Sequence, residues 1–167
     1  APLPSRKKMH SQLTSLIKHS EYHEDILNIS RQWANDLKFQ VGVQHLQNLL
    51  NNKRVSKNLT DIADTLLKCL FIIVNEQFQT KYGMIPGASI SILGLGKLGS
   101  KEMTPSSDLD LVFIYETPDH NDKSNGIKTL HPAKYFSRFS QSYINTISAT
   151  TPYGKLCEVD MRLRPLG

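Results

Sequence analysis

The stretch Gly94-Leu-Gly-Lys-Leu-Gly99 and the stretch Ser107-Asp-Leu-Asp-Leu111, which follows it closely, decide the fold of this chain. The apolar segment 109–115 predicts a β-strand, and side chains two positions apart on a strand share a face. Asp108 and Asp110 should therefore point the same way, an arrangement that costs free energy unless a cation lies between them. Magnesium prefers carboxylate and phosphate oxygens, so a metal carrying a nucleotide phosphate is the expected partner. The pair predicts a nucleotidyltransferase.

A third acidic residue is expected on the same face of a neighbouring strand. Residues 155–163 predict this strand because charged and apolar side chains alternate strictly, with Glu158, Asp160, Arg162 and Arg164 on one face and Val159, Met161 and Leu163 on the other. Nucleotidyl transfer with two metal ions needs convergent carboxylates to hold both cations. We therefore expect Asp108, Asp110 and Asp160 to be the catalytic residues and ligands of two Mg²⁺ ions. The alternative for the Asp108 pair is a solvated edge strand.

The glycine-rich turn predicts a site for the nucleotide. Its spacing is shared with the dinucleotide fingerprint and with phosphate loops. A phosphate loop would need Ser or Thr after Lys97, where Leu98 stands, and a dinucleotide fold would need its acidic residue at the end of the second strand. We instead expect backbone amides to approach a triphosphate at this turn. The predicted nucleotide-binding residues are Gly94, Gly96, Lys97, Ser107 and Arg162.

Several of these residues could instead have a purely structural role. Lys97 could be an ordinary surface lysine, and Glu102 could cap or pair with a short helix. Arg162 and Arg164 could contact the nucleotide or balance the acidic residues around them, since half-buried charges are usually paired.

The first half of the chain predicts helices that support this core. Apolar residues from Ile26 to Leu50 follow helical spacing, and Trp33 lies on the apolar stripe that should be buried. A polar link is expected at Asn51–Asn58, followed by a helix that starts at Thr60 and closes near residue 82. We therefore expect an α+β chain with a helical support region at residues 1–84 and a catalytic core at residues 85–167. Within this core, residues 89–93 predict a strand, residues 98–103 a brief helix and residues 132–147 a longer one.

Composition sets further bounds. The 167 residues carry a formal net charge of +5, which suits a phosphate-bearing partner or simply a solvated surface. Cys69 and Cys157 form no metal or disulfide pattern. The apolar run Leu66–Val74 is too short to span a bilayer, so we expect a cytoplasmic protein with no membrane partner. The absence of an initial methionine and the ending directly after a strand pattern suggest a fragment truncated at its C-terminal end.

Three motifs together resemble the glutamine synthetase adenylyltransferase family, also called glutamate-ammonia-ligase adenylyltransferase. They are Leu95-Gly-Lys-Leu-Gly-Ser-Lys-Glu-Met103, Ser107-Asp-Leu-Asp-Leu111 and Glu158-Val-Asp-Met-Arg-Leu-Arg-Pro165, with support from Ser30-Arg-Gln-Trp33 and Phe39-Gln-Val-Gly42. The resemblance implies a polymerase-β-type nucleotidyltransferase fold and transfer of AMP from ATP to a tyrosine hydroxyl of glutamine synthetase. It also implies a PII-type signalling protein as a partner in regulating nitrogen assimilation.

The resemblance carries site residues over one by one. Asp108 and Asp110 match the metal-binding pair of the family, Asp160 matches its third carboxylate, and Gly96, Lys97 and Ser107 match its nucleotide-binding turn. Family members hold two such units, one that removes AMP by phosphorolysis and one that attaches it. Glu158 resembles the attaching copy, because removing copies usually carry arginine there.

Other functions remain open at this point. The chain could be the AMP-removing copy, a nucleotidyltransferase with an RNA or small-molecule acceptor, or a module that senses ATP without chemistry. An RNA partner is disfavoured because the aromatic residues follow helical core spacing rather than forming a base-stacking surface. A sensing module is disfavoured because all three carboxylates are intact.

Overall fold

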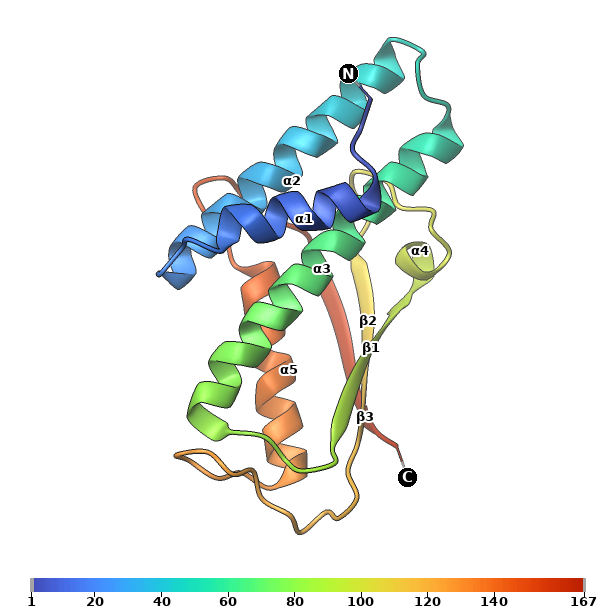
Figure 1. The fold of residues 1–167 in the computed structure, drawn as a ribbon. Coiled ribbons are helices and arrows are strands. Elements are labelled where there is room, and N and C mark those ends of the chain that lie inside the picture. Colours follow the sequence, from blue (N-terminus) through green and yellow to red (C-terminus); the bar gives the residue numbers. More distant parts are fainter. Residues whose placement is uncertain (1, 167) are drawn as a thin grey trace.

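A computed structural model describes residues 2–166 of the chain. It consists of a helical layer followed by a small mixed sheet, which is the α+β arrangement expected from the sequence (Figure 1). The elements in chain order are α1 (Arg6–Ile17), α2 (His23–Leu46), α3 (Asn52–Tyr82), β1 (Ser89–Leu95), α4 (Gly96–Gly99), β2 (Leu109–Glu116), α5 (Pro132–Ser148) and β3 (Val159–Pro165). None of the helices in this range is long and apolar enough to cross a membrane.

The three strands lie in the order β1-β2-β3, with β1 antiparallel and β3 parallel to the central β2. Along β2 the buried positions alternate with half-buried ones, so one face of the sheet is covered and the other is open. The covered face carries Leu109, Leu111, Phe113 and Tyr115. The strands expected at residues 89–93 and 109–115 are confirmed, while β3 begins at Val159 rather than at residue 155.

Helix α5 joins the covered face of the sheet to α3. Phe136 stacks on Tyr115 of β2 with ring centroids 4.5 Å apart, and Tyr143 meets Phe113 edge to face at 5.7 Å. The Tyr143 hydroxyl also donates a hydrogen bond of 2.7 Å to the carbonyl oxygen of Leu67 in α3. One continuous buried core therefore runs from the helices into the sheet, across the boundary expected at residue 84.

Helix α3 is longer than the sequence suggested. It begins at Asn52, eight residues before the expected start at Thr60, so the polar link expected at 51–58 is mostly helical. The Asn51 side chain caps the new start by accepting a hydrogen bond of 2.9 Å from the backbone N–H of Arg54. These residues are polar because this end of α3 projects beyond the core, not because the chain leaves the helix there.

Two other expectations are corrected in the same region. Helix α2 continues without a break through Gly42 and ends at Leu46. Leu46 and Leu49 belong to the apolar stripe expected from the sequence, but their side chains are 84% and 67% exposed. They are exposed because this end of the α2–α3 pair extends beyond the core. Trp33, in the middle of α2, is buried as expected. The short helix expected at residues 98–103 is instead a single turn, α4, at Gly96–Gly99.

Candidate nucleotidyl-transfer site

The open face of the sheet brings two of the predicted carboxylates together. Asp110 on β2 and Asp160 on β3 are direct register partners, and Leu95 at the end of β1 stands opposite Asp110 on its other side. Both aspartates alternate with residues that face the covered side, so their side chains project from the same open face. Asp110 is half-buried and Asp160 is exposed. The sheet therefore aligns two acidic groups across adjacent strands at one end of its open face.

Asp108 lies two residues before Asp110, just ahead of the first residue of β2. It is exposed, and it borders a pocket of about 250 Å³ that also contacts Ser107, Lys38 and Glu158. The backbone N–H of Leu109 donates a hydrogen bond of 2.9 Å to the carbonyl oxygen of Glu158, which ties the start of β2 to the approach to β3. Asp108 thus borders this pocket at the point where the chain enters β2.

The glycine turn packs directly against this pair. Gly96 has a φ of +53°, and a Cβ added there would overlap the carboxylate of Asp110. Only glycine adopts such a conformation without strain, and only glycine leaves room for the acidic side chain. A Cβ on Gly99 would lie 2.6 Å from the carbonyl oxygen of Gly94, so the turn is also closed tightly on itself. The close packing brings backbone of the turn to the edge of the carboxylate site.

The remaining predicted nucleotide-binding residues lie around this site and differ in their exposure and in their hydrogen bonds. Gly94 is inside β1, as the register partner of Leu111, and Lys97 is exposed on α4. The Ser107 hydroxyl closes the local loop, accepting a hydrogen bond of 2.8 Å from the backbone N–H of Thr104. Arg162 is exposed on the open face as the register partner of Val112, and it lies two residues after Asp160 on β3.

The arginines of β3 do not balance the nearby acids. Within residues 2–166 the ion pairs are Arg6–Asp64, Lys57–Asp61 and Lys155–Glu158, and none involves Arg162 or Arg164. Glu158 pairs with Lys155 at 3.0 Å, and Glu102 accepts a hydrogen bond of 3.1 Å from the Ser100 hydroxyl. Arg162 and Arg164 are therefore free to meet an anion that comes to the open face.

The donor set suits a hard divalent cation. Aspartate oxygens are the ligands that Mg²⁺ prefers. Asp110 and Asp160 face the same way, and no cationic side chain of residues 2–166 forms an ion pair with either. In the described part of the chain, no three acidic, histidine or cysteine side chains are yet gathered closely enough to hold a metal ion. Asp108 lies outside the strands, in the loop that precedes β2.

Sequence reasoning missed Lys38, which reaches the site from the helical layer. Its Nζ donates a hydrogen bond of 3.3 Å to the carbonyl oxygen of Leu156, and its side chain borders the same pocket as Asp108. Burial raises the pKa of the neighbouring Cys157 thiol to about 11, although Lys38 and Arg31 oppose the shift and Asp108 and Glu158 add to it. Cys157 is therefore a protonated thiol at neutral pH.

Arg31 is a second residue that the sequence analysis passed over. It is fully buried, and its Nη2 donates to the carbonyl oxygens of Thr146 and Ile147 at 2.8 Å and of Ala149 at 3.0 Å. Burial lowers the pKa of the guanidinium. A signal was available, because Arg31 follows Leu27 by four positions and precedes Ala34 by three on the buried stripe of α2. Arg31 fixes the end of α5 and with it the loop that leads to β3.

Comparison with known proteins decides the family. The sequence pattern of the glutamate-ammonia ligase adenylyltransferase family matches residues 2–167. The chain belongs to this family. It is 35% identical over its whole length to the bifunctional glutamine synthetase adenylyltransferase/adenylyl-removing enzyme of Rhizobium meliloti, and 35% identical over 99% of its length to the enzyme of that name from Mesorhizobium japonicum. The Rhodopseudomonas palustris enzyme of the same name is 36% identical over 99% of the chain.

These relatives are much longer proteins. The chain spans 17% of the length of each of the three. Membership in the glutamate-ammonia ligase adenylyltransferase family implies a nucleotidyltransferase fold. The two activities in the relatives' name belong to whole polypeptides, of which this chain corresponds to about one sixth.

Proposed function

We propose that this chain forms the catalytic core of an adenylyltransferase unit that transfers AMP from ATP to a tyrosine hydroxyl of glutamine synthetase. The observation that carries the proposal is the register pairing of Asp110 with Asp160 on the open face, beside a glycine turn that leaves room for the Asp110 carboxylate. The fold we propose is of the polymerase-β type. Family membership supports both the reaction class and the nucleotide.

Each residue of the site has a proposed role in this reaction. Asp108, Asp110 and Asp160 would hold Mg²⁺, which when bound neutralises phosphate oxygens and favours attack by the acceptor oxygen. The glycine turn at Gly94–Gly99, with Lys97 and Ser107, faces the phosphates. Arg162 lies two residues after Asp160 on the same open face, where its guanidinium would bind the negatively charged phosphates of the nucleotide. In the reaction the tyrosine oxygen bonds to the α-phosphorus, and pyrophosphate leaves.

We assign the attaching direction on the chemistry around Glu158. Removal of AMP by phosphorolysis needs a bound inorganic phosphate, which a cationic side chain would hold. At this place Lys155 is already paired with Glu158 at 3.0 Å, and Asp108 and Glu158 border the same pocket. Asp108 and Glu158 are balanced by Lys38 and Lys155 in this pocket, so it offers a phosphate dianion no excess positive charge, whereas a neutral hydroxyl needs none. Glutamine synthetase as acceptor and a PII-type protein as regulator complete the proposal.

The test uses the complete polypeptide that contains this chain, with ATP labelled on its α-phosphate, Mg²⁺ and glutamine synthetase. Asp110→Asn and Asp160→Asn should each lower the rate of AMP incorporation at least about 100-fold, equivalent to about 2.7 kcal/mol of transition-state stabilisation. Glu116→Gln is the matched control, because Glu116 lies at the other end of the same strand and is exposed. Rates equal to the control in both aspartate variants would disprove the assignment of the site.

The direction is tested separately with adenylylated glutamine synthetase and inorganic phosphate. With any second catalytic unit of the polypeptide inactivated, we expect AMP attachment and no release of ADP. Release of ADP without attachment would make this chain the removing unit. Glu158→Arg then shows whether residue 158 sets the direction, because it should raise phosphate-dependent removal if it does.

A further inference from the structure

The far end of the α2–α3 pair carries an unusual concentration of positive charge. We call residues 37–60 the hairpin tip; it comprises the last part of α2, the connection and the first part of α3. The sequence has no aspartate or glutamate between Asp36 and Asp61, whereas this segment contains Lys38, Lys53, Arg54 and Lys57. Most of the chain's net charge of +5 therefore resides in one projecting hairpin.

Three of these four cations have no acidic partner among residues 2–166. Lys57 pairs with Asp61 at 2.6 Å, and Lys38 is held by the carbonyl oxygen of Leu156. Among the ion pairs of residues 2–166, none includes Lys53 or the Arg54 guanidinium. The hairpin tip thus presents uncompensated positive charge to the outside, which attracts an acidic surface at distances up to about the Debye length of 8–10 Å.

Large apolar side chains are exposed at the same place. Phe39, Leu46 and Leu49 are 74%, 84% and 67% exposed, and all three lie within the hairpin tip. Single exposed apolar residues are ordinary on protein surfaces, but a cluster bordered by polar residues is typical of a docking site. Burying these side chains against a partner would remove apolar surface from water and so favour association.

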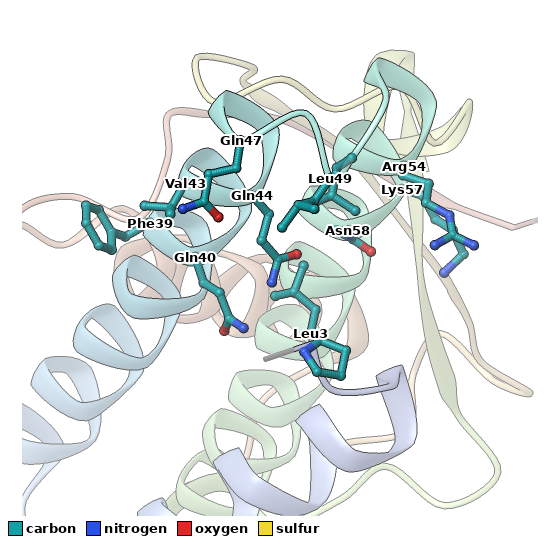
Figure 2. A pocket seen from close by; sticks show the side chains of 12 residues that line it. Leu3, Phe39, Gln40, Val43, Gln44, Gln47, Leu49, Arg54, Lys57 and Asn58 are labelled. Atoms are coloured by element: carbon teal, nitrogen blue, oxygen red, sulfur yellow. The ribbon is translucent and has the colours of Figure 1, made fainter.

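Two of these side chains, Phe39 and Leu49, border a groove of about 790 Å³ between α2 and α3 (Figure 2). Phe39 stands at one side of this groove and Arg54 and Lys57 stand together at the other, with Leu49 between them and Leu3 at the base. On the α2 side the bordering residues run from Phe39 in the helix to Gln47, the residue directly after it, a rise of about 12 Å at 1.5 Å per residue. A groove between two helices is the shape that a third helix fills with its ridge of side chains.

We propose that the hairpin tip is the docking surface for an acidic amphipathic helix of a protein partner. The partner helix lays its apolar stripe along Phe39 and Leu49, and its carboxylates meet Lys53 and Arg54. A protein fits better than a nucleic acid, because Phe39 is the single aromatic residue of the hairpin tip and a strand of bases needs several stacking partners. The proposal does not depend on the catalytic assignment, because it uses none of its residues.

The test measures fluorescence anisotropy of a labelled helical peptide of about 20 residues, built from heptads with leucine at the a and d positions and glutamate elsewhere. Two matched peptides replace all glutamates by lysine or all leucines by serine. We expect the acidic amphipathic peptide to bind at least about tenfold more tightly than either, a difference of about 1.4 kcal/mol. Its affinity should fall as salt is raised.

Variants of the protein locate the binding. Phe39→Ser and Arg54→Glu should each weaken the acidic peptide about tenfold. Ile127→Ser and Lys128→Glu are the controls, since both residues are exposed in the distant 119–128 loop and their changes should leave binding within about twofold. Unfolding temperatures equal to wild type show that the surface changes leave the fold intact. Equal binding of the lysine peptide, indifference to Phe39→Ser, or tighter binding of a single-stranded oligonucleotide would each overturn the proposal.

Discussion

Gly96 and Asp110 depend on each other at the scale of single residues. The positive φ of Gly96 turns the chain at the end of β1, and the missing side chain makes space for the carboxylate. The sequence predicted that Asp108, Asp110 and Asp160 would share a face, because the period of a strand is two. It could not predict that Asp160 would stand directly opposite Asp110, because register between segments 50 residues apart depends on tertiary packing.

Gly96→Ala should therefore damage the site as well as the backbone. An alanine at φ +53° costs about 1–2 kcal/mol, and its Cβ pushes the Asp110 carboxylate aside. Gly154→Ala is the control, because Gly154 has a φ of +87° and open space around it. Both variants should lose stability in urea unfolding, but AMP transfer per folded molecule should fall at least about tenfold only in Gly96→Ala. Equal activities would show that the overlap with Asp110 has no consequence.

The Cys157 thiol should lose its proton only at high pH. Its pKa is raised from 9.0 to about 11, mainly by burial, so the native protein keeps this proton when an unfolded chain has released it. Cys157 thus contributes stability that is complete below pH 9.0 and is lost as pH rises toward 11. In a Cys69→Ala background, the rate of iodoacetamide labelling should reach half its plateau near pH 11 in the native state and near pH 9 in urea. A native midpoint at or below pH 9 would contradict the burial argument.

Helices α2 and α3 show where sequence patterns fail at the scale of elements. Apolar periodicity located the buried part of each helix correctly but not its ends, because the hairpin tip extends beyond the core and has no reason to be apolar on one stripe. The cap at Asn51 marked the true start of α3, yet the following polar residues resembled a link. Strands β1 and β2 and helix α5 were predicted well because each is patterned by the core along its length.

Gly42 offers a test of the continuous α2 helix. It lies in the helix interior, is exposed, and has no neighbour within 4 Å of an added Cβ. Gly42→Ala should stabilise the protein by about 0.8–1 kcal/mol, because alanine loses less backbone entropy on forming a helix. Urea unfolding measures the gain. A loss of stability would mean that α2 bends or breaks at this position in solution.

The whole molecule is held by a core that joins the helical layer to the sheet. Helix α3 contacts α1, α2 and α5, while α5 packs its aromatic side chains on β2. The links that complete this assembly, from Lys38 to Leu156 and from Arg31 to the end of α5, cross more than 100 residues of sequence. Local sequence patterns do not predict contacts between residues so far apart in the chain. The support that the helical layer gives to the site is therefore evident only from the three-dimensional structure.

A single core predicts a single unfolding transition. Trp33 is buried in α2, and Trp33→Ala should cost about 3–5 kcal/mol, whereas Phe39→Ala on the exposed side of the same helix should cost less than about 0.5 kcal/mol. Urea unfolding followed by Trp33 fluorescence should coincide with unfolding followed by far-ultraviolet circular dichroism. Two separate midpoints would show that the helical layer and the sheet unfold independently.

The buried Arg31 also constrains how the chain is made. Its three carbonyl partners lie at the C-terminal end of α5, and the first of them is 115 residues further along the chain. On the ribosome, α2 emerges long before these carbonyl groups exist, so the guanidinium has to stay hydrated while α2 already meets α1 and α3. The burial of Arg31 therefore completes the helical layer only after α5 has been made, and a chaperone that shields this charged position during synthesis would act in that interval.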